Sequence, residues 1–298
     1  ALEGALADAE AGGGFGRRLE PDYVTRSVEI AMRCDFPVKV VWSREEDLQH
    51  DLYRPYYHDR IEAGLDVSGS PVAMAHRVAG SSIMARLYPE DFDGVDADAL
   101  DGSANLPYRI GQHRVEYIRS ETAVPTSWWR GVGGARSAFV VEGFIDELAI
   151  AAGSDPIAYR RGLLEDERTR AVLDLVAEMS GWASPPRAGR ARGVSLIDLW
   201  GTRMAQVVEI GLQGDSFQVE RVTVAVDCGQ PINPLGIEAQ IEGGVIFGLS
   251  AALYGEITIA DGRVEQSNFH DFRVLRINEA PAIDIHIVPN AHEPGGLG

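Results

Sequence analysis

Apolar and polar positions alternate in blocks along the chain, and the blocks predict both strands and helices. Alternating or β-branched runs predict strands at residues 38–42, 61–65, 71–78, 115–118, 205–212, 217–226 and 283–288. Helical spacing predicts helices at residues 22–36, 137–152, 155–163, 171–179 and 234–253. Two more strands, 254–259 and 264–269, flank an Asp-Gly turn that is typical of a hairpin. Strands and helices in blocks, rather than in strict βαβ alternation, favour an α+β fold.

The segments between these elements complete the predicted organisation. Residues 43–60 are expected to be helix or loop, opened by a capping box of Ser43 and Glu46. Six acidic residues between positions 89 and 101 predict a solvated loop. Residues 184–192 have the Pro/Gly/Arg composition of a linker. Residues 1–11 are expected to form a polar helical turn or a disordered leader.

Composition narrows the classes of function. The 298 residues carry a formal net charge of −18 and 45% are hydrophobic, which indicates a folded globular chain of about two domains. The acidic excess is spread along the chain and argues against nucleic-acid binding. Lys39 is the single lysine and lies in an apolar, strand-like run at residues 37–42, so Schiff-base chemistry has one candidate residue and is not favoured.

The spacing of the cysteines and the length of the apolar runs exclude further classes of protein. Cys34 and Cys228 form no C-x-x-C unit, so any iron–sulfur cluster must sit on a partner chain. No apolar run approaches the roughly 18 residues of a membrane span, and residues 1–11 lack the basic start of a signal peptide. The compartment, cytoplasmic or periplasmic, stays open.

Two glycine clusters, residues 12–16 and 131–134, could bind anions. Neither fits the dinucleotide fingerprint, because its sixth position is Arg17 in the first cluster and Arg136 in the second. No Walker A motif and no nucleophile elbow is present. The clusters are therefore either two tight turns or two sets of backbone N–H groups that face an anion.

Several motifs together resemble one family. They are residues 12–18 (GGGFGRR), 38–44 (VKVVWSR), 49–51 (QHD), 53–55 (YRP), 129–133 (WRGVG), 144–149 (FIDELA), 226–229 (VDCG), 233–234 (NP), 240–248 (QIEGGVIFG) and 266–273 (QSNFHDFR). The chain resembles the molybdopterin-binding large subunit of the molybdenum hydroxylase family, which includes xanthine dehydrogenase and aldehyde oxidase. Within the family it is most similar to bacterial isoquinoline 1-oxidoreductase and related aldehyde dehydrogenases. The motifs span nearly the whole chain.

The resemblance implies two mixed α/β lobes, residues 1–120 and 121–298, around a molybdenum–molybdopterin cofactor. It implies no metal-ligating side chain and seven cofactor contacts: Gly13, Gly14, Phe15, Gly16, Arg130, Gly131 and Gln240. Backbone N–H groups of the first glycine cluster would face the molybdenum centre, and Arg130 would pair with an oxyanion. For Arg130 and Gln240, ordinary helix capping is the alternative.

The activity that the resemblance implies is hydroxylation of an aldehyde or an N-heterocycle with oxygen from water. Electrons would leave through 2Fe–2S clusters on a small partner subunit. The cofactor of bacterial relatives is commonly the cytosine dinucleotide form. The rival hypothesis is a catalytically inactive module that binds the cofactor or the iron–sulfur partner without turning over substrate.

The sequence departs from the family where the general base is expected. In the family a glutamate directly follows a motif like residues 294–298 (PGGLG), and this sequence ends at Gly298. Glu293 lies on the wrong side of the glycines to replace it. We therefore expect a fragment that lacks the catalytic residue and is inactive alone. Residues 134–136 (GAR) also replace the expected run after Gly133, which leaves the local pocket chemistry open.

Overall fold

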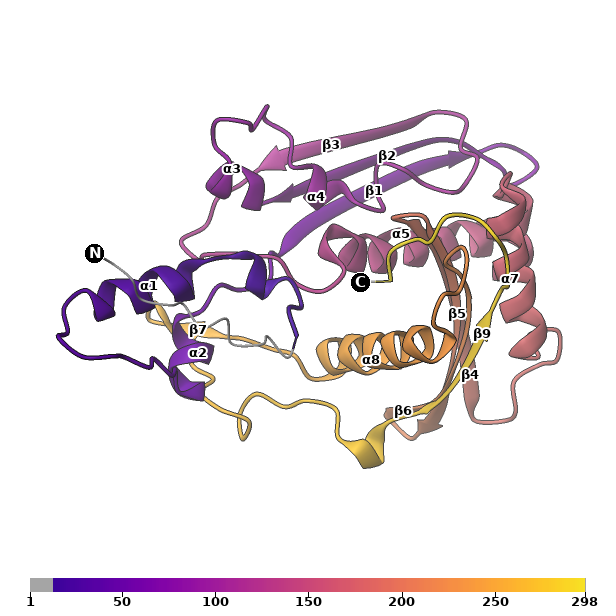
Figure 1. Ribbon diagram of the computed structural model, residues 1–298. Coiled ribbons are helices and arrows are strands. Elements are labelled where there is room, and N and C mark those ends of the chain that lie inside the picture. The colour runs from indigo at the N-terminus through magenta and orange to yellow at the C-terminus, as the bar shows by residue number, and fades with distance from the viewer. Residues whose placement is uncertain (1–12, 298) are drawn as a thin grey trace.

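The computed structural model describes residues 13–297, so the expectation for residues 1–11 lies outside the described residues. A first sheet has the order β1-β2-β3, with β1 antiparallel and β3 parallel to β2 (Figure 1). Its strands are β1 (Tyr57–Leu65), β2 (Pro71–Gly80) and β3 (His113–Arg119).

A second, larger sheet has the order β4-β5-β6-β9. The neighbouring strands β4, β5 and β6 are antiparallel, and β9 lies parallel to β6. The strands are β4 (Arg190–Leu199), β5 (Thr202–Gln213), β6 (Ser216–Asp227) and β9 (Ala282–Ile287). A small hairpin consists of β7 (Ile259–Ala260) and β8 (Arg263–Val264).

Helices precede, connect and cover these sheets. They are η1 (Arg17–Leu19), α1 (Asp22–Ala31), α2 (Arg44–His50), α3 (Ile83–Leu87), α4 (Ala97–Leu100), α5 (Val132–Ala151), α6 (Pro156–Leu163), α7 (Glu167–Met179), α8 (Pro234–Leu253) and η2 (Ile277–Glu279). The combination of separate antiparallel-rich sheets and helices confirms the α+β class. The boundary between lobes at residue 120 stays a prediction.

The second sheet has a hydrophobic core on each face, as Figure 1 shows for α8 and α7 on opposite sides. Alternate residues of β6 (Val222, Val224 and Val226) pack with α8. The intervening Ala225 belongs to the core that α5, α6 and α7 form with β4 and β5. Because side chains alternate across a strand, one apolar run of β6 supplies both cores.

A buried ionic network joins α5 and α6 to β4 and to the loop between β2 and β3. Arg160 of α6 donates to the Glu142 carboxylate of α5 at 2.9 Å, and the Tyr108 hydroxyl donates to the same group at 2.8 Å. The backbone N–H of Leu196 in β4 donates to it at 2.8 Å. Burial raises the pKa of Glu142, while the Arg160 charge and these donors oppose that rise. Four segments therefore depend on one carboxylate.

Several predicted elements are wrong in type or extent. Residues 38–42 pair with no strand among residues 13–297, and Val41 is 76% exposed. Within the predicted loop 89–101, Asp96 is buried and caps α4, since its Oδ1 accepts the Ala99 N–H. The predicted linker 184–192 already contains the start of β4, and the strands predicted at 254–269 shrink to two residues each.

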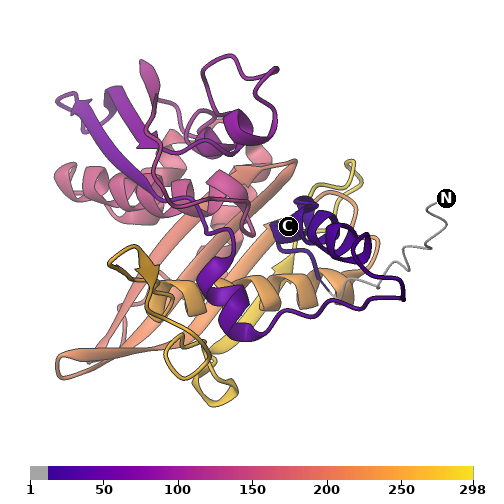
Figure 2. The same ribbon diagram turned by 90° about the vertical axis from the view of Figure 1, so that its left-hand side faces the viewer.

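The N-terminal helices lie beside a distant part of the chain. α2 lies next to the β7–β8 hairpin and the loop that follows it (Figure 2). The Asn268 side chain donates a 2.6 Å hydrogen bond to Glu45 there. Ser43 caps α2 by accepting the Glu46 N–H, which confirms this half of the predicted capping box.

Candidate functional site

Phe247, in the middle of α8, joins three segments that are distant in sequence. Its ring stacks on the Trp129 ring, with centroids 4.8 Å apart, and on the Phe15 ring, with centroids 5.4 Å apart. The Arg54 guanidinium carbon lies 4.5 Å from the Trp129 centroid, within cation–π range. We call these four side chains the aromatic cluster. α8 thus meets the first glycine cluster, the loop before α5 and the loop after α2 at one place.

Arg130 lies at the edge of the aromatic cluster. Its Nη2 donates a 3.0 Å hydrogen bond to the Gln240 carbonyl, and its guanidinium carbon lies 5.9 Å from both phenylalanine centroids. Burial lowers the pKa of Arg130, and no carboxylate between residues 13 and 297 forms an ion pair with it. An arginine keeps its proton even when partly buried. The side chain is therefore a cation that the described part of the chain does not neutralise.

Glycine determines how the loops approach this cation. Gly131 caps α5 with φ +88°, in the left-handed region that favours glycine. On α8, Gly243 and Gly244 face the guanidinium, since a Cβ at either position would lie within 3.6 Å of its nitrogens. Helix backbone, rather than side chains, therefore borders Arg130 on that side.

The first glycine cluster forms a tight turn against the loop that carries Trp129. Phe15 has φ +51° and Gly16 has φ +88°. A Cβ on Gly16 would lie 2.8 Å from the backbone of Trp128, so this position requires glycine. At Gly14, an added Cβ would meet nothing within 4 Å. The cluster is therefore a tight turn with one open side. Such a turn is compatible with both interpretations of the sequence, a tight turn and a set of backbone N–H groups that face an anion.

A pocket of about 360 Å³ opens beside the N-terminus of α8. Its lining is Cys228, Gln230, Ile232, Asn233, Gly236, Ile237, Gln240, Pro294, Gly295 and Leu297, with no charged side chain. The Gln240 amide donates to the Leu297 carbonyl at 3.5 Å. Glu293 is exposed and does not line this pocket. Neutral hydrogen-bonding groups and aliphatic carbon thus surround the space.

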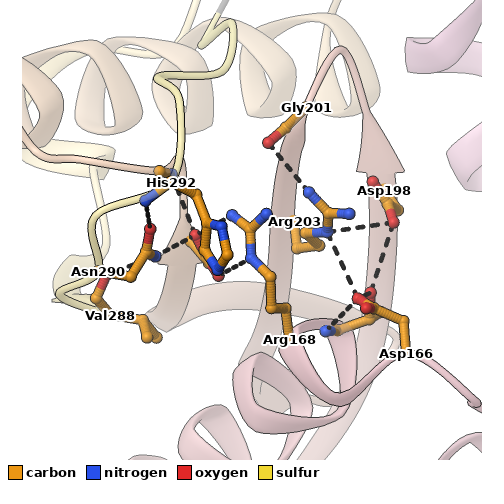
Figure 3. Close-up of polar contacts among 11 residues, drawn as sticks. Asp166, Arg168, Asp198, Gly201, Arg203, Val288, Asn290 and His292 are labelled. Carbon is orange, nitrogen blue, oxygen red and sulfur yellow. Dashed lines mark hydrogen bonds and ion pairs between the residues drawn. The ribbon is translucent and has the colours of Figure 1, made fainter.

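A buried carboxylate, Asp227, ends β6 and directly precedes Cys228, which lines the pocket. Both Asp227 oxygens accept from Arg168 of α7, at 2.6 and 2.8 Å, and Oδ1 also accepts from the Asn290 amide at 2.6 Å. Figure 3 shows the side chains of the two donors, Arg168 and Asn290. Burial alone would raise the pKa of Asp227. Hydrogen bonds from Arg168, the Gly229 N–H and Asn290 outweigh burial and lower it to about 2.

The structure brings the predicted site residues together around α8. Phe15 and Arg130 meet at the aromatic cluster, and the adjoining glycines shape the two turns beside it. Gln240 connects this cluster to the pocket, because its carbonyl binds Arg130 while its amide reaches Leu297. That these residues contact a cofactor stays a prediction.

Four residues of the site were not singled out from the sequence: Arg54, Trp129, Asp227 and Phe247. Each lies within or beside one of the motifs on which the resemblance depends. Phe247 is the one aromatic residue of an otherwise aliphatic and glycine-rich helix, a signal that could have marked it. The others had no local signal, because their partners are distant in sequence.

Comparison with known families decides the identity of this site. Models of a molybdopterin cofactor-binding domain match residues 6–162, more than half of the chain, and residues 197–281. The chain belongs to the molybdopterin cofactor-binding family. The resemblance drawn from the sequence motifs is thereby confirmed, as is molybdopterin as the family's cofactor.

Relatives within this molybdopterin cofactor-binding family are oxidoreductases. The chain is 33% identical to isoquinoline 1-oxidoreductase subunit beta of Brevundimonas diminuta, over 96% of this chain and 38% of that protein. It is 30% identical to the membrane-bound aldehyde dehydrogenase (pyrroloquinoline-quinone) of Gluconacetobacter polyoxogenes, over 96% of this chain and 41% of that protein. The chain thus spans about two fifths of the length of these relatives.

Solved structures show the same fold. The aldehyde oxidoreductase of Desulfovibrio desulfuricans ATCC 27774 aligns with a TM-score of 0.80 at 13% identity, over 96% of this chain and 49% of that one.

Among residues 13–297, no helix is long and apolar enough to cross a membrane. Nor do three His, Cys, Asp or Glu side chains in that range form a group able to hold a metal ion.

Proposed function

We propose that this chain supplies part of the molybdenum–molybdopterin site of an oxidoreductase that hydroxylates aldehydes or N-heterocycles with water-derived oxygen. The observation that carries the proposal is the unneutralised Arg130 cation between the glycine-rich turn and α8. A partly buried cation without a carboxylate partner has lost part of its hydration, which favours the binding of an anion. The phosphate and oxo groups of a molybdopterin cofactor are anions of that kind.

The pocket beside α8 fits the neutral part of such a cofactor. Its volume lies within the range of small-molecule sites, roughly 300 to 1,000 Å³. A pterin is a planar heterocycle with several hydrogen-bond donors and acceptors, and the pocket offers amide groups from Gln230, Asn233 and Gln240. The metal would be held through the pterin, with no ligand from the chain. When bound, the cofactor supplies oxygen-atom transfer and accepts the two electrons of the oxidation.

The chain's own residues would bind the cofactor, orient it and shield it from water. Arg130 would donate charge-assisted hydrogen bonds to an anionic oxygen, which are about twice as strong as neutral ones. The open side of the turn at Gly14 would let backbone N–H groups approach the same anion. The aromatic cluster would exclude water from one side of Arg130, which strengthens its electrostatic effect.

The electron path requires a partner in this proposal. With Cys34 and Cys228 as its two cysteines, the chain cannot ligate an iron–sulfur cluster alone. A small 2Fe–2S subunit would therefore take the electrons. We also propose the cytosine dinucleotide form of the cofactor, as in the resembling bacterial subunits.

Metal and pterin analysis of the purified protein tests the proposal. We expect molybdenum and oxidised pterin in equal amounts, near one per chain, from a host that makes the cofactor. A metal-free protein that still binds an iron–sulfur subunit would instead support the rival hypothesis, a docking module without turnover. Reduction of the whole cofactor-loaded enzyme of which this chain is a part, with each class of substrate in turn, then identifies the aldehyde or N-heterocycle.

A further inference from the structure

The C-terminal segment, residues 290–297, forms one wall of the pocket and is held at several points. The Gly295 N–H donates to the Cys228 carbonyl at 2.8 Å, and the Gly296 N–H donates to the Trp200 carbonyl at 2.9 Å. The Gln230 N–H donates to the His292 carbonyl at 2.9 Å. The segment therefore lies between two turns, the β6 end at residues 227–230 and the β4–β5 turn at residues 200–202.

Close packing leaves the segment little freedom between these turns. A Cβ on Gly229 would lie 2.1 Å from the Glu293 carbonyl oxygen, and a Cβ on Gly295 would lie 2.6 Å from the Gly201 carbonyl oxygen. Real Cβ atoms do not approach other atoms so closely. Backbone thus packs directly on backbone at both contacts, and a displacement of either turn moves the pocket wall.

Both turns are tied to the N-terminus of α7. Arg168, the second residue of α7, forms the bidentate pair with Asp227 that holds the β6 end. On the other turn, Arg203 donates to the Gly201 carbonyl at 3.2 Å and lies 3.5 Å from Asp166, the N-cap of α7. Figure 3 shows the two arginines side by side above that helix end.

Asn290 connects this support to the segment itself. Its amide nitrogen donates to Asp227 at 2.6 Å, while its Oδ1 accepts the His292 N–H at 3.0 Å. The side chain therefore fixes the turn at which the segment leaves β9. Asp227 Oδ1 accepts three hydrogen bonds, from Arg168, the Gly229 N–H and Asn290. Asn290 therefore binds a carboxylate that Arg168 and the Gly229 N–H already orient.

We propose that Asn290 and Asp227 are positioning residues, which fix the path of residues 290–297 and so set the pocket wall opposite Gln240. The inference rests on the proposed function, because the pocket is there taken as part of the cofactor site. Neither side chain touches the cofactor in this proposal. Their effect passes through the backbone of Gly295 and Gly296 to Leu297, whose carbonyl accepts from Gln240.

Asn290→Ala tests the inference, because it keeps the Arg168–Asp227 pair and removes the link to the segment. Hydrogen exchange, Tm and molybdenum content are measured on the purified protein with its cofactor. We expect amide exchange at Gly295 and Gly296 to rise about tenfold or more, and molybdenum per chain to fall by at least half. The control for lowered stability is Val176→Ala, which leaves a cavity at the buried face of α7.

The two variants separate positioning from general destabilisation. Val176→Ala should lower Tm by several degrees, about as much as Asn290→Ala or more, with parental exchange at the two glycines and parental molybdenum content. Unchanged glycine exchange in Asn290→Ala would overturn the inference, as would equal molybdenum loss in both variants. If the parent protein holds no molybdenum, the proposed function fails, and the exchange rates alone decide whether Asn290 positions the segment.

Discussion

Trp129 and Phe247 stack at 4.8 Å with 25° between their ring planes, although 118 positions separate them in the chain. The pair fixes the loop that carries Arg130 to the middle of α8. Phe247 has a second stacking partner, Phe15, so a single ring holds both glycine-rich turns on the same helix. The arrangement of the candidate site therefore depends on Phe247 more than on any other apolar side chain near it.

Phe247→Ala should release these two turns. Aromatic pairs contribute about 0.5 to 1.5 kcal/mol each beyond buried area, so the loss of two pairs should lower the free energy of unfolding by about 1 to 3 kcal/mol. Urea denaturation gives that value, and proteolysis near residue 15 reports the release. Phe247→Leu keeps an apolar side chain without stacking and should lose less stability. Equal stability of Phe247→Ala and the parent would contradict the role assigned to the ring.

Gly16→Ala and Gly14→Ala form a matched pair in the first glycine cluster. Gly16 has φ +88° and its Cβ would meet the Trp128 backbone at 2.8 Å, whereas Gly14 has open space around it. We expect Gly16→Ala to cost about 1 to 3 kcal/mol and Gly14→Ala to change stability by less than about 0.5 kcal/mol. Thermal denaturation measures both. The same loss in both variants would show that the turn differs from the one described.

The buried carboxylate Glu142 should tolerate little change. Glu142→Ala leaves the buried Arg160 with one carboxylate partner, the partly exposed Asp146, at 2.5 Å. Breaking a buried pair from one side typically costs about 3 to 5 kcal/mol. Tyr108→Phe removes one hydrogen bond to the same carboxylate and should cost less, about 1.5 to 3 kcal/mol for a bond to a charged group. Urea unfolding curves for the two variants would reveal the difference, and similar values would show that the ion pair is not the main contribution.

Stability at acid pH should depend on Asp227. Its pKa in the folded protein is about 2, below the ordinary value of 3.8, so the folded state favours the ionised group. The resulting stabilisation, about 2 kcal/mol, is complete above pH 3.8 and is lost as the pH falls through 2. Asp227→Asn should remove this part of the pH dependence between pH 4 and 2 in urea titrations. An unchanged slope in the variant would contradict the assignment.

Local chemistry explains which elements the sequence predicted well. α8 follows the predicted bounds because Asn233 caps it, Pro234 occupies its first turn and a continuous apolar run follows. The apolar run of β6 and the capping aspartate before α6 carry equally local signals. In contrast, the apolar run 38–42 has the composition of a strand, but a strand also needs a neighbour, and pairing depends on the rest of the fold.

The candidate site could be predicted only in part for the same reason. The motifs identified both glycine clusters, Arg130 and Gln240, which do converge on α8. The pairing of Asp227 with Arg168 joins residues 59 positions apart, and nothing near either residue indicates the other. Likewise, Asp96 belongs to an acidic run that suggests a solvated loop. Its burial follows from the groups that it caps, which a charge count does not reveal.

Cofactor retention in Arg130→Met tests the central claim most directly. The variant and the parent protein are purified from the same host, and molybdenum and oxidised pterin are measured per chain. Arg187→Met, which removes an exposed arginine from the loop before β4, is the control. Loss of charge-assisted hydrogen bonds predicts about tenfold to hundredfold weaker retention in Arg130→Met and parental content in Arg187→Met. Parental molybdenum and pterin in Arg130→Met would contradict the assignment of this cation to the cofactor site.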